Sequence, residues 1–269
     1  MNSLIYNIPL HLVPHYRDRR VVVRALELNN IAEVLPDSDR ENLQFIQLPS
    51  AGIEPANLNS FADWGEDVPL DILINDPVQE FPLLYHFSKL LDKHPIRVSI
   101  AVKPGFIKAV KLAAALNFAV KLVVGQPDDV LIEEMSQVLD MYLHRSGISQ
   151  PIEYFHSLFL SSYRQEPTSL WMIQEDDPDH FRFISDEGEE TVSPRFAGSD
   201  PASRTPSNGS SDCSACEFET RCGGYFKWPD ADYNCRGVKI LFATIEAAAE
   251  ELRGDVASMI AVQGGPQPL

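Results

Sequence analysis

Cysteine is absent from residues 1–212 of this 269-residue chain. All four cysteines lie in the stretch 213–235, which reads CSACEFETRCGGYFKWPDADYNC. Any chemistry that depends on thiolates is therefore confined to one short segment near the C-terminal end of the sequence. Four thiols gathered in this way suggest a shared function.

Basic residues are also scarce. The chain has 22 Lys and Arg residues against 39 Asp and Glu residues, a formal net charge of −17 and a pI of about 4.7. This balance opposes nucleic acids and anionic membrane surfaces as partners, because both are themselves negatively charged. We interpret the acidic excess as a solvated surface.

Long hydrophobic runs are lacking as well. No segment approaches the 18 uncharged apolar residues of a membrane-spanning helix. The N-terminal stretch has no basic region before its apolar residues, which Asn7 and Pro9 interrupt, so we expect no signal peptide. These features predict a cytoplasmic protein, and in that compartment clustered cysteines bind metals more often than they form disulfides.

A regular alternation of strands and helices is present up to about residue 165. Hydrophobic residues make up 44% of the chain, enough for a core. Apolar, β-branched stretches predict strands at 20–27, 43–48, 70–76, 96–102 and 118–125. Helical spacing predicts helices at 78–94, 104–117, 127–147, 153–164 and 238–253. This order predicts a parallel sheet whose strands are apolar on both faces, in either a barrel or part-barrel or an open doubly wound sheet.

The region between this alternation and the cysteines is less regular. Residues 170–190 predict a hairpin with a first turn at 176–179 and a second turn at 186–188. The first turn holds an acidic run that we interpret as solvent-exposed. Residues 193–212 are rich in Ser, Pro and Gly and predict a linker or mobile loop.

The four thiols have a spacing of two, five and twelve residues between Cys213, Cys216, Cys222 and Cys235. The first pair can bind one centre from a single tight turn. Four thiolates satisfy either a tetrahedral zinc ion or a four-iron cluster, and the spacing alone favours zinc. Two disulfides, or four unrelated buried cysteines, explain the clustering less well.

The segment CSACEFETRCGGYF, with the later Cys235, resembles the end of a SPASM domain. SPASM domains are iron–sulfur extensions that follow the barrel in many radical SAM peptide-modifying enzymes. The resemblance implies that Cys213, Cys216, Cys222 and Cys235 are the ligands of one auxiliary [4Fe–4S] cluster. The cysteine that would serve a second cluster is replaced by Phe226.

The resemblance also extends, with lower specificity, to the rest of the chain. It implies an α/β fold: a degenerate radical SAM-like partial (β/α) barrel followed by a small cysteine-rich, SPASM-like iron–sulfur domain. The expected boundaries are 1–190 for the barrel-type domain, 191–212 for a linker and 213–269 for the iron–sulfur domain with its C-terminal helix.

The catalytic signature of radical SAM enzymes, Cys-x3-Cys-x2-Cys, is missing, since no cysteine precedes residue 213. We therefore expect no SAM-cleaving cluster and no radical SAM activity of the chain by itself. The chain resembles the SPASM-only member of GeoRSP-type peptide-maturation systems. Its expected partners are a radical SAM/SPASM enzyme and a ribosomally made precursor peptide (RiPP), with the cluster relaying electrons, positioning substrate or stabilising the fold.

Two alternatives remain open from the sequence. One is a Zn²⁺-stapled protein-interaction module with no redox function. The other is an enzyme with its own chemistry at the C-terminal ends of the strands, where parallel sheets place their sites. Polar residues near those ends are Asn75, Asp76, Lys103 and Gln126, although loop residues of this kind are usually structural.

Overall fold

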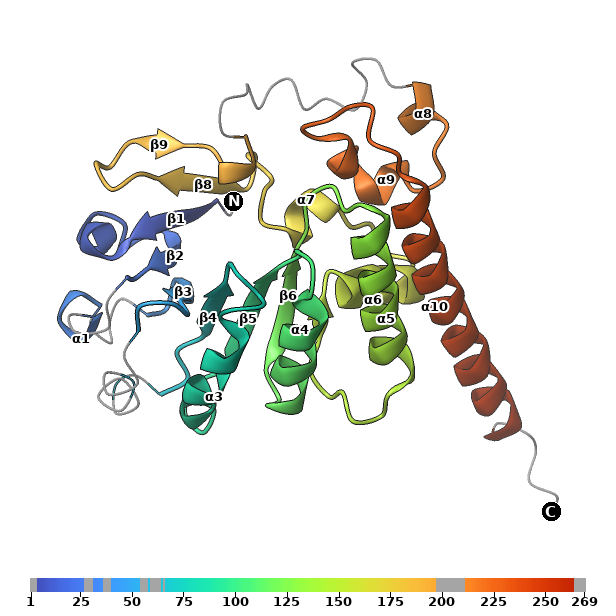
Figure 1. Cartoon of the computed structure of the whole chain (residues 1–269), viewed down its shortest axis with the longest axis horizontal. Helices are drawn as coiled ribbons and strands as arrows, with labels where there is room; N and C mark the ends of the chain where they lie inside the picture. Colours follow the sequence, from blue (N-terminus) through green and yellow to red (C-terminus); the bar gives the residue numbers. More distant parts are fainter. Residues whose placement is uncertain are drawn as a thin grey trace.

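One sheet of nine strands organises the chain (Figure 1). The computed structural model describes residues 4–26, 31–35, 40–53, 58, 64, 66–196 and 211–263. The strands are β1 (Ile5–Pro9), β2 (Arg20–Arg24), β3 (Leu43–Pro49), β4 (Leu70–Ile74), β5 (Ile96–Ala101), β6 (Ala119–Val123), β7 (Ile152–Glu153), β8 (Phe181–Ile184) and β9 (Glu190–Thr191). Their spatial order is β7-β6-β5-β4-β3-β2-β1-β8-β9, and every neighbouring pair is parallel except β8 with β9.

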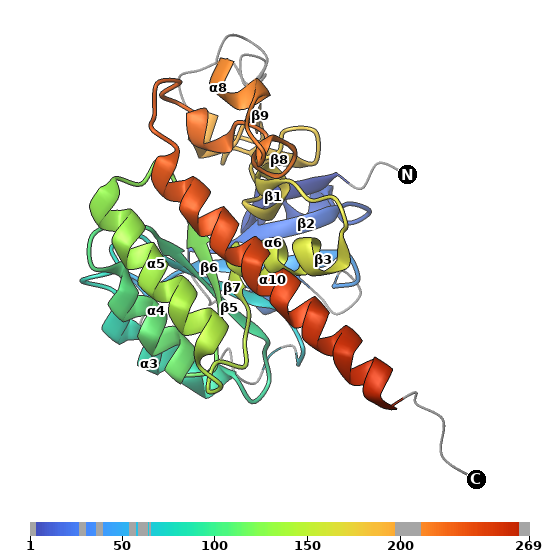
Figure 2. The ribbon, with the colours of Figure 1, turned by 90° about the vertical axis from the view of Figure 1, so that its right-hand side faces the viewer.

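Helices between the strands pack on the sheet, and the long C-terminal helix packs along two of the other helices (Figure 2). The helices of four or more residues are α1 (Ile31–Val34), α3 (Leu84–Phe87), α4 (Phe106–Ala115), α5 (Asp129–His144), α6 (Phe155–Arg164), α7 (Leu170–Ile173), α8 (Ser211–Ser214), α9 (Glu219–Cys222) and α10 (Arg236–Gln263). The 3₁₀ turns are η1 (Leu10–His15), η3 (Phe81–Leu83), η4 (Ser88–Leu90), η5 (Pro194–Phe196) and η7 (Tyr225–Lys227). Within the described residues, β7 and β9 are the two edges of the sheet, so the strands form a partial barrel rather than a closed one.

The central elements confirm the predicted alternation. All five predicted strands are present, and α4, α5 and α6 lie where helical spacing placed them. The predicted helix over 78–94 is shorter than expected and irregular, because η3, α3 and η4 follow one another over residues 81–90. The strand β1 was not predicted, and α10 runs ten residues beyond its predicted end at 253.

The predicted first hairpin turn at 176–179 is wrong. Residues 170–173 form the helix α7 instead of a strand, so the turn connects a helix to β8. The second turn is confirmed, because β8 and β9 pair in antiparallel fashion around Gly188, which has a φ of +85°. Of the predicted linker, residues 197–210 lie outside the described part of the chain.

One face of the sheet is apolar and buried. Its side chains come from alternate positions of each strand, and α4 packs against β5 and β6 on this side. Representative buried residues are Val23, Ile46, Ile72, Val98 and Leu122. This face and the helices form the main core of the molecule.

The opposite face of the sheet carries a row of polar and charged side chains, which corrects the prediction that both faces are apolar. The strand register places Arg24, Gln47, Asp71 and Arg97 side by side on β2 to β5. Arg97 donates to the fully buried Asp71 at 2.7 Å, and Gln47 donates to the same carboxylate at 3.0 Å.

Two further groups extend this row beyond the sheet. Glu175, in the segment after α7, pairs with Arg97 and with Lys121 of β6, both at 2.7 Å. The acidic run at 175–179 is therefore not simply a solvated turn: Glu175 attaches the segment to the sheet. Burial alone would raise the pKa of Asp71, but the charge and hydrogen bonds of Arg97 outweigh it and lower that pKa.

None of the helices in the described residues is both long enough and apolar enough to cross a bilayer.

Replacement of Asp71 by Asn tests the importance of the charged row. The variant leaves buried Arg97 without its carboxylate partner on β4, so we expect the free energy of unfolding to fall by about 3 to 5 kcal/mol. The wild-type contribution should also be lost as the pH falls below about 4, because the pKa of Asp71 is lower in the folded state than in the unfolded state. Urea unfolding at several pH values measures both effects.

The matched control is Arg182→Gln. Arg182 forms a more exposed ion pair with Glu190 at 2.7 Å, and its loss should cost less than about 1 kcal/mol. Equal losses in the two variants would contradict a special role for the row.

Candidate metal centre

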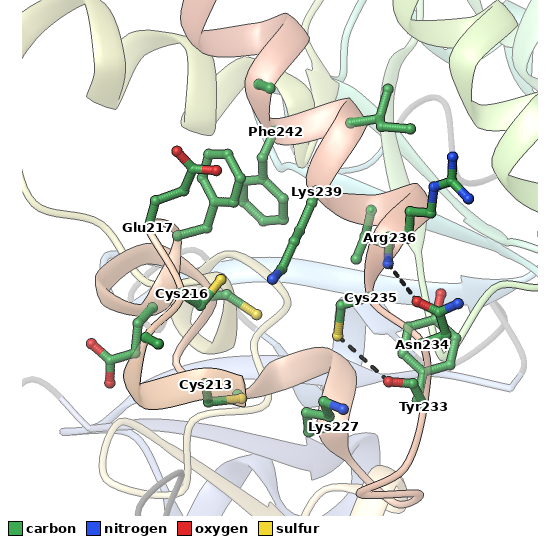
Figure 3. Close-up of a pocket in the computed structure, with 18 of the residues that line it drawn as sticks. Cys213, Cys216, Glu217, Lys227, Tyr233, Asn234, Cys235, Arg236, Lys239 and Phe242 are labelled. Carbon is green, nitrogen blue, oxygen red and sulfur yellow. Dashed lines mark hydrogen bonds between the residues drawn. The ribbon is translucent and has the colours of Figure 1, made fainter. Parts of the chain in front are cut away.

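The four cysteines of the segment 213–235, called the cysteine segment below, line one cavity of about 900 Å³ (Figure 3). Cys213 lies in α8, Cys216 in the turn that follows, Cys222 at the end of α9, and Cys235 immediately before α10. All four are free thiols of intermediate exposure. The structure therefore brings the predicted ligand residues to one place.

Short backbone contacts shape this arrangement. The amide of Cys216 donates to the carbonyl of Cys213 at 3.0 Å, which closes the tight turn between the first two thiols. After Cys222, Gly223 and Gly224 both have left-handed backbones, with φ of +55° and +73°. Glycine adopts this conformation without strain, so the chain can reverse directly behind the third thiol.

The fourth thiol is positioned by close packing of helices. Gly237, two residues after Cys235, lies against Ile132 of α5, and a Cβ at this position would stand 2.7 Å from a side-chain carbon of Ile132. The absence of a side chain thus lets the start of α10 approach α5. This approach brings Cys235 to the cavity.

The cysteine segment is fastened to the C-terminal end of β6. Tyr225 donates to the carbonyl of Val124 at 3.0 Å, and Arg195 donates to the same carbonyl at 3.1 Å. Arg195 also donates to the carbonyl of Tyr225 at 2.9 Å, and its guanidinium lies 3.7 Å from the centre of the Tyr225 ring. Trp171 of α7 donates to the carbonyl of Gly223 at 2.8 Å.

Gln126, one of the polar residues near the strand ends, contacts the cysteine segment. Its side-chain amide donates to the carbonyls of Phe226 at 2.9 Å and Asp230 at 2.7 Å, so it holds the cysteine segment at the sheet. Lys103 donates to the carbonyl of Asn75, and the Asp76 carboxylate accepts the amides of the turn that follows it. The side chains of Gln126, Lys103 and Asp76 are thus engaged in contacts that shape the loops at the ends of the strands.

Aromatic rings form the inner wall of the cavity. Phe218 and Phe242 stack with ring centres 5.3 Å apart, and both line the cavity. Phe226 and Tyr154 pack against Phe242 from behind, at 6.3 and 6.4 Å. Phe226 therefore fills core space at the position where the SPASM pattern would place a further cysteine.

Burial makes two of the thiols, Cys222 and Cys235, weaker acids in the absence of a metal. It raises the pKa of Cys222 to about 11, and hydrogen bonds from the backbone amides of Phe226 and Tyr225 offset part of this rise. The pKa of Cys235 is also raised by burial, while Lys227 and Lys239 act in the opposite direction. Metal binding must release these protons, so any metal affinity should increase with pH.

A buried hydroxyl close to this wall has no hydrogen-bond partner. The side chain of Tyr154 is fully buried, and its oxygen contacts no donor or acceptor among the described residues. After burial itself, the neighbouring Tyr233 and Cys222 raise the pKa of Tyr154, which places the hydroxyl in their electrostatic environment. Most buried hydroxyls are paired, so this one marks a place where a polar partner fits.

The spacing of the thiols bears on which group fits the cavity. Among the residues that the structure describes, no three Cys, His, Asp or Glu side chains come close enough together to hold one metal ion. The donor set itself is chemically suited to a metal or to an iron–sulfur cluster, because thiolates bind both. The cavity is thus lined by four thiols of suitable chemistry, but they do not lie close enough together to coordinate one metal ion.

Two sets of residues near the site were not found from the sequence. The charged row hides as single polar residues within apolar strands, such as Asp71 in LDILI and Lys121 in AVKLV. The second is Arg195, which holds the cysteine segment at the end of β6 and lies in the stretch that was interpreted as a linker. The sequence did contain one signal for the charged row: polar residues interrupt several successive apolar strands at matching positions.

Among solved structures, the fold is similar to that of native anSMEcpe with bound AdoMet and the Cp18Cys peptide. The TM-score is 0.63 and the sequence identity 9%, over 94% of this chain and 99% of that chain. The likeness shows that the two chains share a fold, which in this chain is built on a parallel sheet that forms a partial barrel. No protein-family model and no curated protein sequence matches the chain.

Replacement of Tyr154 by Phe tests whether its hydroxyl is unpartnered. Removal of an unpaired buried hydroxyl removes its desolvation cost, so we expect the metal-free protein to become more stable by about 1 kcal/mol. The control is Tyr142→Phe, which removes a hydroxyl that lies 2.7 Å from His156 and should lower stability by about 1 kcal/mol. Denaturant unfolding of the two metal-free variants gives the comparison, and equal losses would show that Tyr154 has a partner.

Proposed function

We propose that this chain is an accessory iron–sulfur protein of a peptide-modification system. In this proposal Cys213, Cys216, Cys222 and Cys235 hold one [4Fe–4S] cluster. The protein acts beside a partner radical SAM enzyme, a precursor peptide, or both, in the cytoplasm. The observation that carries the proposal is the convergence of all four thiols of the chain on one cavity.

The spacing of the thiols supports a cluster over a single zinc ion. Zinc binds thiolate sulfur at about 2.3 Å, so four zinc ligands stand almost in contact with one another. In a four-iron cluster each thiolate binds a different iron, and the four sulfur ligands surround the cluster at a greater separation. Among the described residues no three such side chains come close enough to share one metal ion, which favours the second arrangement.

The surroundings of the thiols support the same proposal. Aromatic rings on the inner wall keep water from one side of the cavity, and burial of this kind is one way in which proteins adjust cluster potentials. The backbone amides of Phe226 and Tyr225 that are directed at Cys222 supply hydrogen bonds to sulfur.

The likeness to anSMEcpe supports the peptide-modification setting. That protein was solved with AdoMet and a peptide, and this chain shares its fold over nearly its whole length. This chain has no cysteine before residue 213, so it lacks the thiolates for a SAM-cleaving cluster. We therefore assign the radical step to a partner enzyme and an accessory role to this chain.

A bound cluster would supply either one-electron transfer or a rigid cross-link. The residues around it would determine which of these two roles it has. Four thiolate ligands leave no iron open for direct coordination of substrate. The chain's own contribution is to hold α8, α9 and the start of α10 in fixed relation to β6.

Metal and sulfide analysis of protein purified without oxygen tests the proposal. We expect about four iron and four sulfide per chain, with a broad absorption band of the cluster. Cys222→Ala should lose most of both. The matched control is Thr220→Ala, an exposed residue of the same segment, which should retain both.

The alternative has a distinct result. About one zinc per chain, no sulfide, and loss of zinc in Cys222→Ala would overturn the redox proposal in favour of a zinc-stapled interaction module. In that case binding to a partner, and not electron transfer, would be the function to pursue.

The accessory role has its own test. With a radical SAM/SPASM enzyme and its precursor peptide, product formation should require this protein and should be lost with Cys222→Ala but kept with Thr220→Ala. Equal product yield in the absence of this protein would rule out an accessory role toward that enzyme.

A further inference from the structure

Two lysines join the cysteines in lining the cavity. Lys227 ends η7, and Lys239 lies in the first turns of α10. Figure 3 shows the side chain of Lys239 extending from α10 into the space between Cys216 and Cys235. The ammonium of Lys239 therefore faces the thiols and is not directed along the outer surface.

The position of Lys239 follows from helix geometry. It is four residues after Cys235, and its amide donates to the Cys235 carbonyl at 2.9 Å. Side chains four residues apart lie on the same face of a helix. The same turn of α10 thus presents a thiol and an ammonium group to one cavity.

The positive charge of Lys239 is not neutralised by a neighbouring carboxylate among the described residues. The chain as a whole is strongly acidic, yet Lys239 forms no ion pair with a carboxylate in the described part of the chain. The other charged residues that line the cavity are Lys227, Arg236, Glu217, Glu219 and Asp232.

We propose that Lys239 is the charge-compensating residue of the thiolate site and raises the reduction potential of the bound cluster. This inference rests on the proposed function and deepens it. Four thiolates and an oxidised [4Fe–4S] core carry a net charge of two minus, and the addition of one electron makes it three minus. A half-buried cation beside the ligands stabilises the more negative state, so it favours reduction.

The test is a redox titration of the loaded protein with dithionite as the electron donor, followed by the electron paramagnetic resonance signal of the reduced cluster. For Lys239→Met we expect the ratio of reduced to oxidised cluster at a fixed potential to fall about tenfold, which corresponds to a midpoint about 59 mV lower. Lys239→Arg keeps the charge and should restore most of the ratio.

The matched control is Lys108→Met, an exposed lysine on α4 away from the cavity, which should leave the ratio unchanged. A midpoint in Lys239→Met equal to that of the wild type, with both proteins loaded, would overturn this inference and leave the proposed function intact. Wild-type protein without iron and sulfide would overturn both.

Loading itself provides a second readout. If Lys239→Met takes up no cluster while Lys239→Arg does, the positive charge is needed to assemble the four thiolates, and the charge-compensating role is supported. If neither variant takes up a cluster but Lys108→Met does, the lysine side chain matters for its packing, and the inference is overturned.

Discussion

The attachment of the cysteine segment to the end of β6 is the constraint on which the candidate site depends. Segments of this length, with four half-exposed thiols and little regular structure, have no core of their own. Here Tyr225 and Arg195 share the carbonyl of Val124, and Trp171 holds the carbonyl of Gly223. The sheet thus supplies the rigidity that the segment lacks.

The same anchoring continues into the charged row of the sheet. Glu175 pairs with Arg97 and Lys121, and the next residue, Asp176, accepts a hydrogen bond from Tyr225 at 3.0 Å. Two adjacent carboxylates therefore connect the sheet face on one side and the cysteine segment on the other. A disturbance of the row should be felt at the thiols through this connection, although the two sites share no residue.

Much of the fold was predictable, because the spacing of apolar residues and the length of each apolar stretch follow directly from which residues are buried. Stretches such as IRVSIA and AVKLV were recognised as strands by their apolar positions. The same stretches misled about the second face, since a single Arg97 or Lys121 in an apolar run gives no indication of its partner. That partner, Glu175, lies far away in the sequence, and only the tertiary arrangement brings it near.

The four cysteines of the candidate site could be predicted from the sequence, but the side chains that surround them could not. The spacing of the cysteines indicated one shared centre, and the structure places all four around one cavity. The spacing could not show that Lys239 faces the thiols, that Tyr154 keeps an unpaired hydroxyl, or that Arg195 in the assumed linker holds the segment. Each of these depends on packing between elements that are separate in sequence.

The parallel pairing of β1 with β8 has a consequence for synthesis of the protein. Residue Ile5 pairs with Phe181, so β1 has one of its two neighbours about 175 residues later in the sequence, at β8. On the ribosome, β1 waits with one open edge until β8 has emerged, and such long-range pairing is slow to form. The thiols emerge later still, so the cavity that they line would be among the last parts of the structure to form.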